Sequence, residues 1–131
     1  MQSTINILGV AGSVRADSYS TKALKIALEQ AKKYSADVLM LDLSKTVLPL
    51  CDPSTPSSEQ AEEVVKAVEW ADAFILASPD YHGLMSCTLK NFLDQFYKGF
   101  SCKVFGYIVA SHEKGLTVMD QMRIVMRQCY G

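Results

Sequence analysis

The chain has 131 residues, of which 49% are hydrophobic, and a formal net charge of −1 at pH 7. This length accommodates one compact domain with its own core and is too short for two typical domains, so residues 1–131 are expected to form a single domain. The near-balanced charge gives no broad attraction to nucleic acids or anionic membranes, which excludes both as expected partners. Small molecules are the expected partners.

The four cysteines, Cys51, Cys87, Cys102 and Cys129, are widely spaced and form neither a C-x-x-C pair nor a zinc-binding pattern. Reduced thiols of a cytoplasmic protein fit this spacing. The first residues lack the basic start and cleavage site of a signal peptide, and their apolar run is far shorter than the ~20 residues that span a bilayer. The two histidines lie in separate segments, so no metal site is predicted.

The first predicted element is a strand over residues 5–10, which is short, rich in β-branched residues and bounded by glycine. Apolar residues at helical spacing over 24–31 predict a helix that covers a sheet. A second strand is expected over 38–43, followed by a connection rich in proline and aspartate. Ser57 is expected to cap the next helix, whose apolar stripe occupies 61–68.

The second half continues the alternation. Residues 73–78 predict a third buried strand that Pro79 ends, because proline cannot donate to a central ladder. An apolar stripe over 89–96 predicts a third helix, 104–110 a fourth strand, and 118–129 a fourth helix. Strands alternating with helices imply right-handed crossovers and a parallel sheet covered on both faces. The predicted fold class is therefore α/β, a three-layer, doubly wound parallel sheet.

In a doubly wound sheet of strand order 2-1-3-4, the helices after the first and third strands leave toward opposite faces, which opens a crevice at the carboxyl ends of those strands. Two loops, 13–20 and 79–83, are predicted to open into this crevice. A ligand site is therefore expected between them.

The segment from Gly9 to Ser20 combines two glycines, three serines and one arginine between a predicted strand and a predicted helix. Backbone N–H groups, hydroxyls and the guanidinium converge there on the positive end of a helix dipole, where an anion binds well. Glycine and serine also fill ordinary strand-to-helix turns, so this segment alone leaves both interpretations about equally open. Asp17 would repel a phosphate and is expected to face solvent or to pair with a cation.

The loop lacks the lysine of a G-x-x-x-x-G-K-[ST] triphosphate site and the third glycine of a G-x-G-x-x-G dinucleotide fingerprint. A terminal phosphate monoester remains, because neutral hydroxyls and one arginine offer many hydrogen bonds without excess charge. The candidate ligands of the phosphate are Ser13, Arg15, Ser18, Ser20 and Thr21.

Loop 79–83 suits a flat aromatic ring. Tyr81 and His82 offer planar surfaces, and Gly83 allows the backbone to approach a ring closely. For either side chain alone, a half-buried tyrosine at a rim or a solvated loop histidine is the more common situation. The loop as a unit is therefore more informative than its members.

Two motifs carry a family resemblance. Residues 12–18, Gly-Ser-Val-Arg-Ala-Asp-Ser, are similar to G-S-x-R-x-x-S, and residues 79–83, Pro-Asp-Tyr-His-Gly, are similar to P-E-Y-[NH]-G, with a downstream L-K-N-x-x-D at 89–94. Both motifs belong to the NAD(P)H-dependent FMN reductases of flavodoxin-like fold, which include azo-dye, quinone and chromate reductases. The resemblance covers nearly all of the chain.

The resemblance implies an oxidoreductase that transfers a hydride from NAD(P)H to FMN and then reduces a quinone, azo, metal-oxyanion or free-flavin acceptor. It implies that Ser13, Arg15, Ser18 and Ser20 hold the FMN phosphate, and that the isoalloxazine ring is lined by Pro79, Asp80, Tyr81, His82 and Gly83. Asp80 replaces the more usual glutamate. Ser111 and His112 stand where the family has a glycine-rich loop beside the flavin, and they are further candidates. No catalytic side chain is assigned, because the cofactor carries the chemistry.

The resemblance also implies a homodimer or homotetramer and a fifth strand, which would begin near Cys129-Tyr130-Gly131, where the sequence ends. A C-terminally short domain of strand order 2-1-3-4 is therefore expected. A naturally shortened domain, a truncated chain and a strand supplied by a partner are all open explanations.

Three other functions are weighed against the reductase. A non-enzymatic electron carrier of the flavodoxin type is disfavoured by the near-neutral charge, because such carriers present acidic faces. The second alternative is a structural domain that binds no flavin, which the missing fifth strand makes conceivable. A nucleophile built from Cys87 with His82 or His112 is the third; nothing orients the pair, and Cys87 is expected to pack at the start of a helix.

Overall fold

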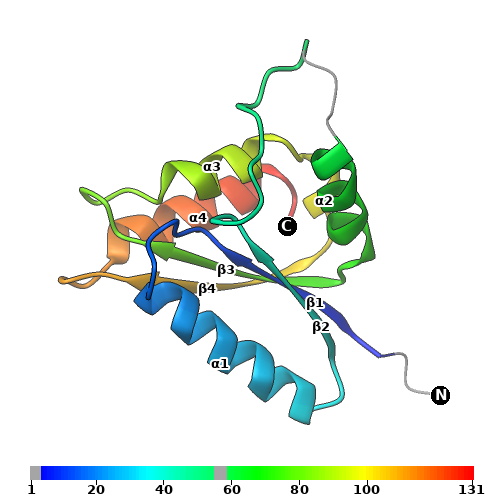
Figure 1. Cartoon of the computed structure of the whole chain (residues 1–131), viewed down its shortest axis with the longest axis horizontal. Helices are drawn as coiled ribbons and strands as arrows, with labels where there is room; N and C mark the ends of the chain where they lie inside the picture. The colour runs from blue at the N-terminus through cyan, green and yellow to red at the C-terminus, as the bar shows by residue number, and fades with distance from the viewer. Residues whose placement is uncertain (1–3, 55–58) are drawn as a thin grey trace.

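Figure 1 shows a twisted parallel sheet with helices on both faces. The computed structural model describes residues 4–54 and 59–131. Within these residues the sheet has four strands, β1 (Asn6–Ala11), β2 (Asp37–Asp42), β3 (Ala73–Pro79) and β4 (Val104–Ala110), in the order β2-β1-β3-β4. All three pairings are parallel. The predicted fold class and strand order are confirmed.

The helices are α1 (Tyr19–Lys33), α2 (Glu59–Trp70), α3 (Cys87–Asp94), α4 (Leu116–Gln128) and the short 3-10 helix η1 (Lys98–Phe100). Helix α1 covers one face of the sheet, and α2, α3 and α4 lie on the other (Figure 1). The expected cap at Ser57 lies outside the described residues. No helix in the described part of the chain combines the length and the apolar character that crossing a bilayer requires.

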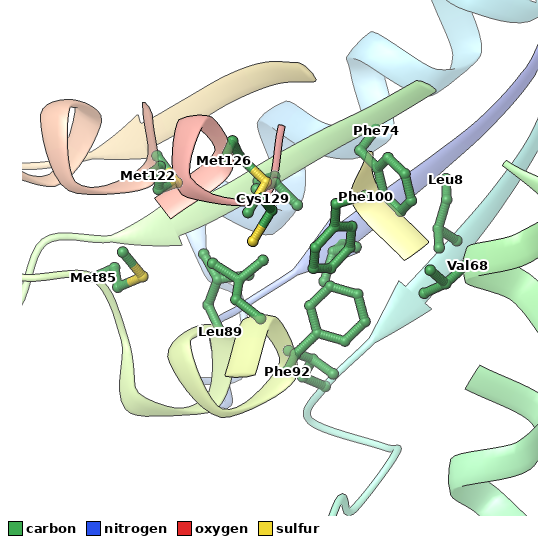
Figure 2. Packing of buried hydrophobic residues seen from close by; sticks show 14 of the residues in the cluster. Leu8, Val68, Phe74, Met85, Leu89, Phe92, Phe100, Met122, Met126 and Cys129 are labelled. Carbon is green, nitrogen blue, oxygen red and sulfur yellow. The ribbon is translucent and has the colours of Figure 1, made fainter. Parts of the chain in front are cut away.

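The main core lies between the sheet and helices α2, α3 and α4, where aromatic rings and methionines interlock (Figure 2). The ring of Phe74 on β3 stacks on Phe105 at a centroid distance of 5.0 Å and meets Phe100 edge-on at 5.3 Å. Met122 and Met126 of α4 fill the space beside Leu89 of α3. A smaller core under α1 packs Leu24 and Leu28 against the ends of β1 and β3.

Strands β1 and β2 are shifted by one residue from the predicted ranges, and two further boundaries differ for a clear physical reason. Helix α3 ends at Asp94, short of the predicted stripe, because the chain turns into η1 and buries Phe100 completely. Phe96 still packs on Phe92, at 5.4 Å between ring centroids, from beyond the helix end. Pro79 is the last residue of β3 and does not stop the strand before it, because the ladder continues through the Asp80 N–H, which donates to the Ala110 carbonyl at 2.8 Å.

Gly12, directly after β1, is where three elements meet most closely. Its N–H donates to the Ala77 carbonyl of β3 at 2.8 Å. A Cβ on Gly12 would lie 2.8 Å from the Leu89 Cβ and 2.9 Å from the Ala77 carbonyl oxygen. The Ala77 oxygen belongs to the backbone, and the Leu89 Cβ is fixed to the backbone of α3. Neither atom can therefore move without displacing β3 or α3. Only glycine fits between β1, β3 and α3.

We expect Gly12→Ala to lower the free energy of unfolding by about 1–3 kcal/mol, the usual cost of overpacking a filled core. Chemical denaturation followed by circular dichroism measures the change. Gly106→Ala on β4 is the matched control, because its Cβ would find its nearest neighbour at 3.8 Å, an ordinary contact. Equal effects of the two substitutions would contradict the packing argument.

Candidate functional site

A cavity of about 880 Å³ opens at the carboxyl ends of β1, β3 and β4. This volume falls within the range of small-molecule sites in proteins. Its lining comes from the loop after β1 and the start of α1, from the end of β3, and from the end of β4 with the loop that follows. The lining residues are Ser13, Arg15, Ser18, Tyr19, Ser20, Ala23, Pro79, Asp80, Tyr81, Ile108, Val109, Ala110, Ser111 and His112.

One end of the cavity is built by the loop before α1. Ser13, Ser18 and Ser20 are buried, at 3%, 7% and 1% exposed, so their hydroxyls are held in place by surrounding structure. Ser18 caps α1, and its hydroxyl lies 2.9 Å from that of Ser20. The first turn of α1 carries no acidic residue, so nothing there offsets the positive end of the dipole of this 15-residue helix. This end of the cavity is suited to an anion.

The charged side chains of this loop are arranged consistently with an anion site. Arg15 lines the cavity, and its backbone N–H donates to the Ser13 hydroxyl at 3.2 Å. Asp17 is 92% exposed, and its carboxylate lies 3.7 Å from the Lys22 amine. The prediction that Asp17 faces solvent or pairs with a cation is therefore confirmed.

The other end of the cavity is organised by the carboxylate of Asp80. One oxygen accepts a hydrogen bond from the Gly83 N–H at 2.7 Å, and the other accepts one from the Ser111 hydroxyl at 2.8 Å. The Ser111 hydroxyl in turn accepts from the Glu113 N–H at 3.0 Å. Asp80 thus ties the loop after β3 to the loop after β4.

The loop after β3 is a tight turn. Tyr81 and Leu84 form an isolated bridge, exchanging backbone hydrogen bonds of 3.0 and 3.1 Å. His82 and Gly83, at the tip, have φ values of 59° and 77°, in the left-handed region that favours glycine. The turn directs Tyr81, which is 46% exposed, to the rim of the cavity.

Most of the predicted site residues line this one cavity: Ser13, Arg15, Ser18, Ser20, Pro79, Asp80, Tyr81, Ser111 and His112. Thr21, His82 and Gly83 lie outside the lining. Thr21 contributes its backbone N–H to the Ser18 cap at 3.5 Å, and His82 is exposed at the tip of the turn.

Sequence reasoning missed part of the lining. Tyr19 and Ala23 lie one helical turn apart at the start of α1, and Ile108, Val109 and Ala110 end β4. The available signal was the rule that ligands bind at the carboxyl ends of parallel strands, which applies to β4 as much as to β1 and β3. Pro79 and Ala110 are register partners, so the ends of β3 and β4 necessarily reach the same edge.

The thiols offer no alternative chemistry in this cavity. All four cysteines are free, and Cys87 is exposed at the start of α3, where the sequence predicted that it would pack. Burial raises the pKa of the Cys129 thiol, directly after α4, so this thiol stays protonated at neutral pH. Within residues 4–54 and 59–131, no three His, Cys, Asp or Glu side chains are grouped as a metal site requires.

Comparison with known proteins identifies the family. The family model described as NADPH-dependent FMN reductase matches residues 5–131. The chain belongs to this family.

The relatives of this FMN reductase family member are consistent with the assignment. An FMN-dependent NADPH-azoreductase of Staphylococcus aureus is 28% identical over 134 residues, which cover 93% of this chain and 69% of the azoreductase. Solved structures share the fold. The apo form of the NADH:FMN oxidoreductase EMOB superposes with a TM-score of 0.82 at 22% identity, covering 96% of this chain and 70% of that one. FerB of Paracoccus denitrificans gives 0.80 at 18% identity, covering 96% and 72%.

Substitution of Asp80 tests whether its two hydrogen bonds hold the loops after β3 and β4 together. We expect Asp80→Ala to speed amide hydrogen exchange at Gly83 and Glu113 about tenfold, because both loops lose the group that joins them. Asp80→Asn is the matched control, since its amide keeps an acceptor oxygen and has a similar size, and it should show a smaller effect. Unchanged exchange in Asp80→Ala would show that the loops hold their shape without this carboxylate.

Proposed function

We propose that this chain is an FMN-dependent oxidoreductase that takes a hydride from NADPH and reduces a small-molecule acceptor. The observation that carries the proposal is that one cavity combines a buried serine cluster at the start of α1 with the turn after β3, in a chain of the FMN reductase family. One end of the cavity offers hydrogen-bond donors for an anion, and the other offers the planar side chain of Tyr81. This arrangement suits a ligand that carries a phosphate and an aromatic ring.

The donor chemistry fits the phosphate of FMN. We assign the phosphate to Ser13, Arg15, Ser18 and Ser20, which line the cavity at the positive end of the α1 dipole. Hydroxyls that donate hydrogen bonds satisfy the phosphate oxygens, and a single guanidinium adds charge without crowding. Thr21 acts through the Ser18 cap, which orders the first turn of α1.

The other end of the cavity is assigned to the isoalloxazine ring. Pro79, Asp80 and Tyr81 line it from β3, and Ser111 and His112 line it from the loop after β4. His82 and Gly83 form the tip of the turn that sets the direction of Tyr81. Residues from both of the loops that Asp80 joins would therefore hold the ring.

The chemistry that FMN supplies when bound is acceptance of a hydride and delivery of reducing equivalents to a second substrate. The residues of this chain bind and orient the reactants, and none is assigned as an acid or base. Much of the rate acceleration in such a site comes from holding two reactants in a reactive geometry.

The acceptor class follows from relatives by analogy. The similar proteins include an FMN-dependent NADPH-azoreductase and an NAD(P)H:quinone oxidoreductase from Methanothermobacter marburgensis, so an azo compound or a quinone is the proposed acceptor. A cytoplasmic location is proposed on the strength of four free cysteines. A homodimer or homotetramer is proposed from the family resemblance, and the exposed apolar side chains of Leu84 and Leu116, which follow the two cavity loops in sequence, are available for such a contact.

The test of the proposed function uses the purified chain. We expect it to bind FMN, to gain thermal stability from it, and to oxidise NADPH only when FMN and an azo dye or quinone are present. The FMN absorption bands should bleach on anaerobic addition of NADPH. Binding without NADPH oxidation would favour an electron carrier, and no gain in stability with FMN would favour a flavin-free domain; either result overturns the proposal.

The phosphate assignment has its own test. Arg15→Ala should raise the dissociation constant of FMN about tenfold, because a charged donor to the phosphate is lost, and leave that of riboflavin nearly unchanged. Fluorescence titration of both flavins measures this difference. Arg15→Lys, which keeps the charge and loses the fork of donors, should lie between wild type and Arg15→Ala. Equal weakening of both flavins would place Arg15 away from the phosphate.

A further inference from the structure

The carbonyl of Gly12 accepts hydrogen bonds from two hydroxyls of the α3 region. The Ser86 hydroxyl donates to it at 2.6 Å and the Thr88 hydroxyl at 2.5 Å. Ser86 is 3% exposed, and these donors lie 74 and 76 residues from Gly12 in sequence. Neither Ser86 nor Thr88 is among the residues that line the cavity. Their contact with the site runs through Gly12.

The Gly12 carbonyl fixes the direction of the next N–H group. A trans peptide is planar, with its C=O and N–H pointing in opposite directions, and the described residues contain no cis peptide bond. Because the carbonyl points toward the first turn of α3, the Ser13 N–H points away from α3. Ser13 itself lines the cavity and accepts a hydrogen bond from the Arg15 N–H. The orientation of this one peptide therefore sets the direction in which residues 13–18, the anion loop, leave the end of β1.

Ser86 is itself held in place by hydrogen bonds to β3 and to the first turn of α3. The Ser86 N–H donates to the Ser78 hydroxyl at 3.0 Å, and the Ser86 hydroxyl accepts from the Leu89 N–H at 3.3 Å as the cap of α3. Ser78 is fully buried at the end of β3 and donates to the Pro79 carbonyl at 2.8 Å. The first turn of α3 thus connects the start of the anion loop with the strand end that precedes the turn after β3.

We propose that Ser86 and Thr88 are positioning residues for phosphate binding, acting on the ligand through the Gly12 carbonyl without touching it. The proposal rests on the proposed function, because it takes the ligand of the anion loop to be the phosphate of FMN. Under this proposal, the first turn of α3 increases the affinity for a flavin that carries a phosphate relative to a flavin that lacks one.

Thr88→Val tests the proposal, because valine keeps the shape of threonine and lacks the hydroxyl. We expect the dissociation constant of FMN to rise about fivefold, the effect of one net hydrogen bond, while that of riboflavin stays within about twofold of wild type. Thr88→Ser restores the hydroxyl and should recover FMN affinity. Thr46→Val is the matched control, since it makes the same chemical change at a partly buried threonine in the connection after β2.

Fluorescence titration with FMN and riboflavin, and a thermal melt of the flavin-free protein, separate the outcomes. Ser86→Ala also removes the cap of α3 and can unfold the protein, so the decision rests on Thr88. A folded Thr88→Val that keeps the wild-type ratio of FMN to riboflavin affinity overturns the proposal, and so does equal weakening of both flavins. Absence of flavin binding by the wild-type chain instead overturns the proposed function.

Discussion

The close approach of Gly12 to β3 and α3 is the constraint on which the cavity depends. The end of β1 is pinned there from two sides, by the Ala77 carbonyl that accepts its N–H and by the hydroxyls of α3 that donate to its carbonyl. Any side chain at this position would displace either β3 or α3. The loop that follows therefore leaves from a fixed point and in a fixed direction, and α1 begins where its dipole faces the cavity.

The cavity is electrically asymmetric. Its α1 end has serine hydroxyls, Arg15 and the start of a helix whose first turn carries no acidic residue, and its other end has the Asp80 carboxylate, held by two hydrogen bonds. A ligand with one anionic group is therefore oriented by electrostatics, with that group at α1. Asp17, the carboxylate that would weaken this asymmetry, is turned to solvent beside Lys22.

The fold was predictable from hydrophobic periodicity, because each strand and helix buries a face whose spacing is visible in sequence. The positions of the two loops followed from topology alone. What periodicity could not reveal was contact between distant side chains: the Asp80 to Ser111 hydrogen bond spans 31 residues and the Thr88 to Gly12 bond 76. The end of α3 was also missed, because the burial of Phe100 in η1 overrides the apolar stripe that continues to Phe96.

The cavity lining is discontinuous, with its segments near residues 13–23, 79–81 and 108–112. These come together only when β1, β3 and β4 are paired, so no isolated fragment of the chain presents the site. A ligand can therefore bind this cavity only after the sheet has formed, and it does not assist the early steps of folding. A ligand bound in this cavity would instead stabilise the folded domain and reduce the fraction of opened, protease-sensitive molecules as the ligand concentration rises.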